Sequence, residues 1–316
     1  MNGHGYVFVL TPIDLVCPEG VEVAPSHRLV RANEEQTQKI KQVLEQFNTN
    51  PFFFPTPYEN TIRSVPGERP GEVRYPRSAL PRENWRYWII EFDGTNSELQ
   101  ELGFACSLIP NDIELGFHVI FHETFNGPSL GWDPAALSTY FNHGFEYLLT
   151  KPINQQNLNQ IRRNFDDIKN LPPEYPHIRR ALIRFDQLRW LPRRSEMVVI
   201  GLFSVIESLV SHAPKLTDSA DSLSHQIRTK LPLLRKRFAD PLDHFSQFPS
   251  IEEENLWKKL YAYRSKIVHG EDSQLSGDLT SLKQVESVIA FLRETSKRLI
   301  HLSLREPQFM TDLKKC

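Results

Sequence analysis

Three prolines within residues 171–176 divide the chain into two parts with different hydrophobic patterns. Because proline lacks a backbone N–H and has a fixed φ, this segment interrupts any regular element that reaches it. Aromatic and β-branched runs of strand length precede the segment, and apolar residues recur at helical spacing after it. We therefore predict an α+β protein, in which a mixed α/β domain at 1–170 is followed by an all-α helical bundle at 177–304 and a C-terminal tail at 305–316.

The first part contains three runs with the length and composition of β-strands, at 6–10, 86–92 and 116–122. They predict a small sheet. Asn33 followed by Gln36 resembles a capping pair, and apolar residues at helical spacing then predict a helix that continues to about residue 48. At least one helix is therefore expected to pack on the sheet.

Two further segments complete the first part. Between Pro51 and Pro81 there are seven prolines and two glycines, which predicts a long irregular loop. From about Pro134 the pattern changes towards helix, and residues 154–169 carry a clear apolar face.

The second part has an amphipathic pattern of helical period over most of its length. We expect five helical segments, at roughly 177–190, 195–212, 219–237, 251–269 and 281–304. Each segment has an apolar stripe that needs a partner, which predicts a helical bundle.

The net charge of the 316-residue chain is −2, which argues against a uniformly basic nucleic-acid-binding protein. The charge is unevenly distributed, however. Residues 1–170 contain 14 Lys and Arg against 21 Asp and Glu, a balance of −7. Residues 171–316 contain 23 Lys and Arg against 18 Asp and Glu, a balance of +5. Only the second part of the chain therefore favours polyanions.

No apolar run approaches the roughly 18 residues needed to span a bilayer, and the first residues lack the basic and apolar regions of a signal peptide. Cys17, Cys106 and Cys316 are too few and too scattered for a disulfide framework or a zinc site. These features predict a cytoplasmic protein that makes no membrane contact.

The segment 252–270 has two stripes at helical spacing. Leu256, Leu260, Tyr263 and Ile267 form the first stripe, and Trp257, Tyr261, Arg264 and Val268 form the second, about 100° away. One stripe suffices for a bundle core, so the second stripe is a candidate surface for a partner subunit. The alternative is a single broad core stripe with Arg264 extending from its edge towards solvent.

The same segment ends in His269 and Gly270, and glycine commonly terminates helices. Arg264 and His269 are five residues apart, about 140° around an ideal helix, so they reach one cleft only if the helix ends at His269. A histidine before a terminating glycine is otherwise an ordinary helix-end residue.

The expected helix around residues 195–212 is apolar over most of its circumference. Its remaining strip carries Glu207 as a single carboxylate among small residues. Such a strip suits a groove in which another group approaches closely. The alternative is that Glu207 is an exposed or ion-paired helix acid.

Residues 202–209, Leu-Phe-Ser-Val-Ile-Glu-Ser-Leu, followed after about 55 residues by Tyr-Arg-Ser-Lys-Ile-Val-His-Gly at 263–270, resemble a HEPN domain of the ApeA-like branch. Residues 180–190 are similar to the first helix of that branch. The resemblance covers about 175–304, under half of the chain, and it implies a HEPN-type helical bundle that dimerises.

The resemblance also implies an activity, because many HEPN proteins are metal-independent ribonucleases with an arginine and, four to six residues later, a histidine. Arg264 and His269 match this motif. The resemblance implies that Arg264 contacts the scissile phosphate and that His269 is the acid/base for attack by the ribose 2′-hydroxyl, which leaves a cyclic phosphate. We expect Glu207 to orient one of these two residues, and Ser265, Tyr263 and Tyr261 to support the site.

The sequence departs from the family pattern at Ser265, where active members usually have Asn, Asp or His. This departure keeps a second hypothesis open, in which the bundle has lost catalysis and acts in dimerisation or in binding nucleic acid or protein. The leading hypothesis is an endoribonuclease effector of a prokaryotic phage-defence or toxin system. Its substrate would be tRNA or other cellular RNA, and its N-terminal domain would sense a trigger or bind an inhibitor.

Basic residues near the motif are candidates for contacts with the RNA backbone. They are Lys266, Arg228, Lys230, Arg235, Lys236 and Arg237. The alternative for this stretch is an ordinary solvated face.

Three weaker candidates lie in the first part of the chain. His118, His122 and the nearby Glu123 could bind a metal from one face of a strand, although a packed or surface pair is the ordinary interpretation. The aromatic side chains within 85–88 could stack on bases but are ordinary core residues. We find no nucleotide-binding loop and expect neither a metal nor a cofactor.

Overall fold

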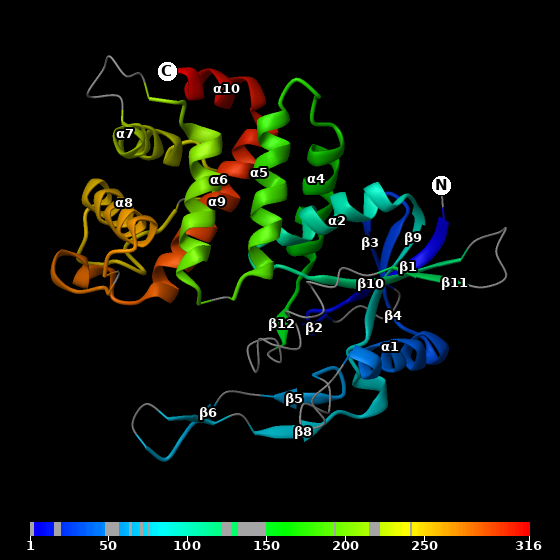
Figure 1. Cartoon of the computed structure of the whole chain (residues 1–316). Coiled ribbons are helices and arrows are strands. Elements are labelled where there is room, and N and C mark those ends of the chain that lie inside the picture. The colour runs from blue at the N-terminus through cyan, green and yellow to red at the C-terminus, as the bar shows by residue number, and fades with distance from the viewer. Residues whose placement is uncertain are drawn as a thin grey trace. The chain divides into compact units, whose positions relative to one another are not determined.

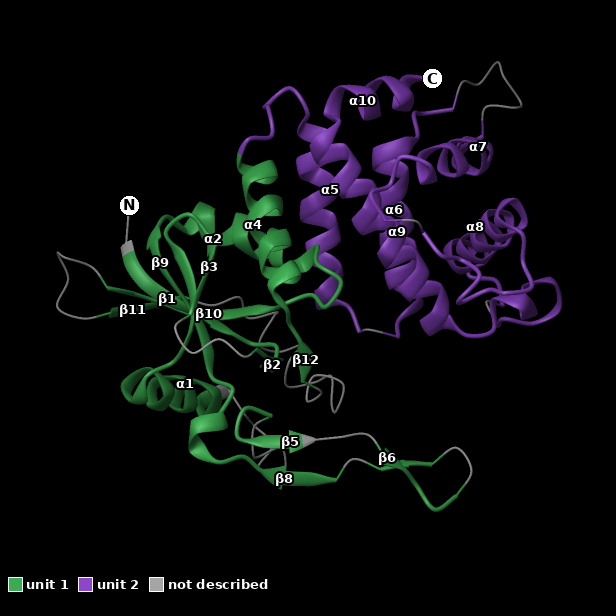
Figure 2. Cartoon of the chain, turned by 180° about the vertical axis from the view of Figure 1, so that it is seen from behind, with its two compact units in different colours: residues 1–169 green, residues 170–316 purple. Residues whose placement is uncertain are grey.

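The computed structural model describes residues 3–15, 20–47, 57–62, 65–69, 72–74, 76–121, 128–131, 150–192, 194–214, 222–240, 242–272 and 274–316. The chain consists of two compact units, Met1–Lys169 and Asn170–Cys316 (Figure 2).

The N-terminal unit is built on a six-stranded antiparallel sheet in which β1 and β9 are central. The strands, in spatial order, are β11 (Pro128–Gly131), β10 (Leu115–Phe121), β1 (Gly3–Val9), β9 (Trp88–Gly94), β4 (His27–Arg31) and β3 (Val21–Ala24). The three predicted strands correspond to β1, β9 and β10, so these predictions are confirmed. Two short strands, β2 (Ile13–Asp14) and β12 (Lys151–Pro152), pair in parallel beside this sheet.

Helices cover both faces of the sheet (Figure 1). Phe8 and Ile89, which are paired across β1 and β9, belong to the core under α1 (Glu34–Phe47). Because side chains alternate along a strand, the neighbouring Val7 and Ile90 point to the other face. That face carries α2 (Asn96–Ser107) and α4 (Gln155–Lys169), which pack on each other, and α4 also packs on β3.

The predicted capping pair of α1 is confirmed, since Asn33 Oδ1 accepts from Gln36 N at 2.9 Å and Gln36 Oε1 accepts from Asn33 N at 2.8 Å. The sequence did not indicate α2, although Thr95 and Glu98 form a capping box at its start.

The predicted irregular loop between Pro51 and Pro81 is wrong in part. Within its described residues, two short antiparallel pairs form, and 3-10 helix η2 (Arg82–Asn84) follows. The pairs are β5 (Asn60–Ile62) with β8 (Arg77–Ala79), and β6 (Val65–Pro66) with β7 (Val73–Arg74). These strands are only two or three residues long, which is how they fit between the prolines. The helical pattern predicted from Pro134 begins outside the described residues.

In its described residues the C-terminal unit contains helices and no strand. It contains α5 (Pro176–Gln187), α6 (Glu196–Val210), α7 (Leu223–Arg235), α8 (Glu253–His269), α9 (Val285–Arg305) and α10 (Pro307–Lys315), with 3-10 helices η4 (Leu188–Trp190) and η5 (Gly277–Leu282). The five predicted helical segments correspond to α5 through α9. The all-α character of this part is therefore confirmed for the described residues.

Helix α6 is the centre of the bundle, because it packs against α5, α7, α8, α9 and α10. Eight apolar residues of α6, including Leu202 and Phe203, are buried. A helix that is apolar over most of its circumference is stable only with neighbours on most sides. Only the strip that contains Glu207 is left without buried apolar side chains on α6.

The sequence predicts a C-terminal tail at 305–316, and this prediction is wrong. These residues contain α10, which packs on α6 and α9. Pro307 occupies the first turn, where its missing N–H costs nothing, and Met310 is fully buried. The apolar residues of this helix are too few for its period to have been evident in the sequence.

Among the described residues, no helix combines the length and the apolarity that a membrane crossing requires.

Candidate active site

Helices α6 and α8 bring Glu207 and Arg264 together. Arg264 Nη2 lies 3.6 Å from Glu207 Oε1, and the two side chains are 22% and 17% exposed. The separation is an ion pair but exceeds the length of a hydrogen bond. The ion pair therefore joins two residues that are 57 positions apart in the sequence and lie on different helices.

The pair leaves hydrogen-bonding capacity unused. Glu207 Oε1 and Arg264 Nε are both buried, and neither has a hydrogen-bond partner among the described residues. Other buried atoms of the described residues share this state, among them Nε of Arg228 and Nε of Arg298, and a ligand or water is the usual explanation. Arg264 thus retains an N–H donor that a bound group can accept from.

Tyr261 lies on the same side of α8 as the arginine. The guanidinium carbon of Arg264 is 5.6 Å from the centre of the Tyr261 ring, which is close enough for a cation–π contact. The ring also meets Phe203 of α6 edge-on at 5.9 Å. Tyr261 therefore packs between the bundle core and Arg264, and it restricts where the guanidinium can lie.

Burial around the Arg264–Glu207 pair changes the pKa values of the neighbouring ionisable groups. Burial raises the pKa of the Glu207 carboxyl, and the positive charge of Arg264 opposes the rise. Burial raises the pKa of Tyr261 as well, and the Glu207 charge adds to it. A carboxyl with a raised pKa can hold or exchange a proton nearer neutral pH than an ordinary one.

His269 is the last residue of α8 and is exposed. Gly270 follows in the left-handed region at φ 67° and ends the helix, as the sequence predicted. Among the described residues, no hydrogen bond or ion pair joins His269 to Arg264 or Glu207. An offset of five residues places His269 about 7.5 Å further along the axis and about 140° around the helix. The structure brings Arg264 and Glu207 together but does not bring His269 to them.

Tyr263 lies in the core and does not line the site. Its side chain is fully buried, and its hydroxyl donates to Glu196 Oε1, near the start of α6, at 2.9 Å. Burial and the Glu196 carboxylate raise the pKa of Tyr263. Ser265 and Lys266 are half-buried on other sides of α8.

The basic stretch of α7 is largely engaged with carboxylates. Three ion pairs hold it: Arg228 with Glu254 at 2.8 Å, Arg235 with Glu253 at 2.6 Å, and Arg237 with Glu306 at 2.5 Å. Lys236 is exposed at the C-terminal end of the helix.

The prediction that Lys230 lies on an RNA-binding surface is wrong in its placement. Lys230 is 6% exposed, and its ammonium donates to Val210 O at 3.0 Å. That carbonyl is one of the last of α6, which the helix itself leaves unpaired. The ammonium therefore caps a helix inside the bundle.

The second stripe of α8 does not form one free surface. Trp257 is 1% exposed and packs against Phe291 of α9 with ring centres 5.5 Å apart. Tyr261 and Arg264 are half-buried, and Val268 is 46% exposed. The C-terminal half of the stripe alone is open to a partner, because α9 covers the N-terminal half.

A cavity of about 570 Å³ between α7 and the start of α8 was not indicated by the sequence. Its lining includes His225, Arg228 and Thr229 from α7 and the acidic residues 252–254. The three glutamates outnumber the single arginine, so the lining is net acidic and does not suit an anionic ligand such as RNA.

The weaker candidates of the first part have ordinary positions. His118 is half-buried, and burial lowers its pKa, whereas His122 and Glu123 lie outside the described residues. Within the described part of the chain, no group of three or more His, Cys, Asp and Glu could hold a metal. Tyr87 and Trp88 are core residues of the N-terminal unit, and Trp85 is half-buried.

Comparison of the chain with protein-family models, with curated proteins and with solved structures finds no match.

Proposed function

We propose that the chain is a metal-independent endoribonuclease with a HEPN-type helical unit. The observation that carries the proposal is the buried Nε–H of Arg264, which has no hydrogen-bond partner among the described residues and lies beside the carboxyl of Glu207. A guanidinium with unused donors in a low-dielectric place is suited to a phosphoryl group whose negative charge grows during reaction.

The proposed reaction is a transesterification within the RNA backbone. The ribose 2′-oxygen loses its proton and attacks the adjacent phosphorus, the bond from phosphorus to the 5′-oxygen breaks, and that oxygen gains a proton. The products are a 2′,3′-cyclic phosphate and a free 5′-hydroxyl. Arg264 compensates the charge on the phosphoryl oxygens, and His269 exchanges the protons at the ribose oxygens.

Glu207 has a positioning role in this proposal. Its carboxyl holds the Nη2 end of the guanidinium at 3.6 Å, while Tyr261 packs against the same group. The Nε–H of Arg264 is the donor that this proposal assigns to the phosphate, and because Nε is buried, RNA binding has to expose it. His269 is exposed at the end of α8, so it can meet the RNA from the solvent side.

The proposal extends to the biological setting implied by the sequence resemblance. The RNA cleaved would be tRNA or another cellular RNA, in a prokaryotic phage-defence or toxin system. The N-terminal unit would sense the trigger or bind an inhibitor. A homodimer would form through the helical unit, where Val268 at the end of α8 is exposed.

A second candidate is a HEPN-like module that binds nucleic acid or protein without cleaving it. The separation of His269 from the Arg264–Glu207 pair favours this candidate, as does Ser265 in the position after the motif arginine. The two candidates differ in a single measurable property, the cleavage of RNA.

The test is cleavage of tRNA and mixed cellular RNA by the purified chain in EDTA. We expect cleavage by the wild type and a loss of at least about 10²-fold in His269→Ala and in Arg264→Ala. Tyr261→Phe is the matched control, because it keeps the ring that packs against Arg264. If the wild type cleaves RNA and both alanine variants cleave it equally well, the assigned site is wrong. If the wild type cleaves nothing, the binding-module candidate replaces the nuclease.

A further inference from the structure

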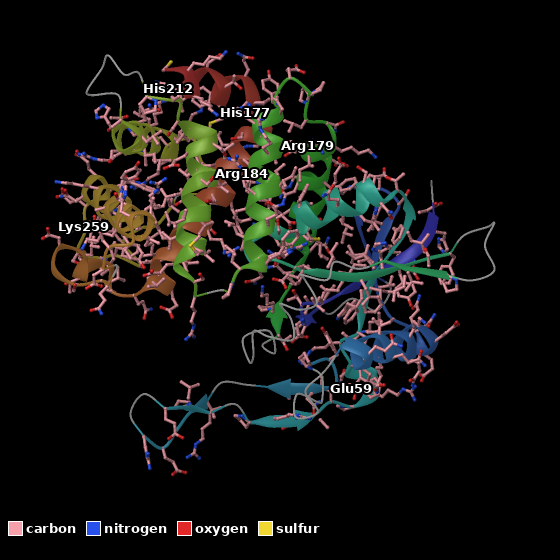
Figure 3. All side chains as sticks on the ribbon, viewed as in Figure 1. Glu59, His177, Arg179, Arg184, His212 and Lys259 are labelled. Atoms are coloured by element: carbon pink, nitrogen blue, oxygen red, sulfur yellow. The ribbon has the colours of Figure 1, made fainter. Side chains whose placement is uncertain are left out.

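A row of basic side chains follows one flank of α5. His177, Arg180 and Arg184 are spaced i, i+3 and i+7, which places them on one side of a helix. The arginines are exposed, whereas Ile178, Ala181 and other apolar residues of α5 are buried. Figure 3 shows His177 and Arg184 along α5, with His212 beyond the C-terminal end of α6.

Lys314 of α10 adds a further cation to this region, and its position is fixed at several points. Its ammonium donates to Ser208 O, near the C-terminal end of α6, at 2.7 Å. Its own carbonyl oxygen lies 3.0 Å from His212 Nδ1 and 3.5 Å from the ammonium of Lys230. Three neighbours therefore hold the last turn of α10 at the end of α6.

The charges of this region act on one another. The pKa of Lys314 is lowered by burial and also by Arg180, Arg184 and Lys230. The pKa of His177 is lowered by burial and also by Lys314 and Arg180. No carboxylate is among these causes, so the charges that act on Lys314 and His177 are all positive.

The contrast with the basic stretch of α7 is direct. Arg228, Arg235 and Arg237 each have a carboxylate at 2.8 Å or less. Within the part of the chain that the structure describes, no carboxylate lies within ion-pair distance of Arg180, Arg184 or Lys314. Like charges that gather without counter-ions destabilise the fold slightly, and a bound polyanion relieves the repulsion.

We propose that Arg180, Arg184 and Lys314 form a binding site for the backbone phosphates of single-stranded RNA. The proposal rests on the proposed function, which makes RNA the substrate. Guanidinium groups bind phosphate oxygens through paired N–H donors, and the i, i+4 spacing of Arg180 and Arg184 presents two such groups side by side. Lys314 uses one N–H for Ser208 O and keeps two more donors for a phosphate.

The experiment measures binding of a fluorescently labelled 2′-O-methyl RNA to the full-length protein at several salt concentrations. The blocked 2′-oxygen of this probe cannot attack, so binding is measured without cleavage. For single strands, each phosphate neutralised contributes about 0.7 to the slope of log affinity against log salt. We expect Arg180→Gln/Arg184→Gln to bind more weakly and to lower the slope by about 1.4, which is two such contributions.

The control is Arg228→Gln/Arg237→Gln, which changes the net charge by the same amount but removes arginines that carboxylates already neutralise. It should keep a slope close to that of the wild type. Equal losses of affinity in both double variants would overturn the proposal, because they indicate a general charge effect. Unchanged affinity and salt slope in Arg180→Gln/Arg184→Gln would also overturn it. So would a wild type that does not bind the probe. Probe binding that depends on Arg180 and Arg184, in a protein that cleaves no RNA, would support this site and refute the nuclease.

Discussion

In the proposed chemistry, Arg264 and His269 act on the RNA and Glu207 positions Arg264. Burial raises the pKa of the Glu207 carboxyl above its usual value of 4.5, while Arg264 opposes the shift. The folded protein therefore binds this proton more tightly than the unfolded chain does. The stability that the carboxyl contributes is present below the unfolded pKa and is lost as the pH rises through the folded pKa.

This linkage predicts the pH dependence of Glu207→Gln, whose amide cannot ionise. As the pH rises from the unfolded pKa of about 4.3 through the raised folded pKa, the wild type should lose thermal stability relative to this variant. Melting curves of both proteins across this range measure the difference.

Glu98→Gln supplies a control of opposite sign, because the hydrogen bond from Lys169 lowers the pKa of Glu98. The stability that the Glu98 carboxylate contributes is present above the unfolded pKa and is lost as the pH falls. The thermal stability of the wild type should therefore increase relative to this variant as the pH rises. The same sign for both variants would contradict the assignment for Glu207.

Tyr263 and Tyr261 differ in what their hydroxyls do, although they are two residues apart. Tyr263→Phe removes a buried hydrogen bond to Glu196 and should lower the free energy of unfolding by about 1–3 kcal/mol. Tyr261→Phe should cost less, because within the described residues the Tyr261 hydroxyl makes no hydrogen bond. Urea unfolding measures both. A larger loss in Tyr261→Phe would show that the two tyrosines have been assigned the wrong roles.

At the scale of elements, the end of α8 decides where His269 lies. Gly270 adopts φ 67°, and a Cβ there would meet nothing within 4 Å, so the cost of a side chain comes from the backbone alone. Gly270→Ala should destabilise the protein by about 1 kcal/mol, and Gly270→Asn by less, since asparagine tolerates this conformation.

Gly103 is the matched control, because it lies inside α2 and a Cβ there also meets nothing within 4 Å. Gly103→Ala should stabilise by about 0.5–1 kcal/mol, since alanine favours helix. Chemical denaturation of the variants provides the comparison. A neutral Gly270→Ala would indicate that the helix does not end as described.

Elements with a strong local signal could be predicted from the sequence. The helix α1 was found from its cap at Asn33 and from its apolar period, and β9 from its aromatic and branched run. Helix α2 was missed although Thr95 and Glu98 form its cap, because its apolar residues are spread around the helix and give little period. Helix α10 was missed because tertiary packing of residues such as Met310 stabilises it.

At the scale of the whole molecule, the two compact units meet in sequence at residues 169 and 170, next to the three prolines. Limited proteolysis should first cut within 170–176 or between 51 and 81, because connecting segments are more accessible than packed helices. Mass spectrometry of the fragments locates the cuts. Early cuts within α6 or α8, with both segments intact, would contradict two separable units.

The composition of the candidate site could be predicted in part. The helical spacing around residues 207 and 264 was sufficient to place both in helices of one bundle. The burial of Trp257 and Lys230 was not predictable, because it depends on which neighbours cover α8 and on the unpaired carbonyls at the end of α6. The row of cations on α5 was not predictable for the same reason, because its electrostatic influence on Lys314 depends on how α10 packs in the bundle.

The central claim is that Arg264 and His269 promote attack by the ribose 2′-hydroxyl. The most direct test treats an RNA oligonucleotide and its all-2′-deoxy counterpart with the wild type and with Arg264→Ala in EDTA, and determines the ends of the products. The account predicts that the wild type alone cleaves, that only the RNA is cut, and that its products carry a 2′,3′-cyclic phosphate and a 5′-hydroxyl. Cleavage of the deoxy oligonucleotide, products with 5′-phosphate ends, or equal cleavage by Arg264→Ala would contradict it.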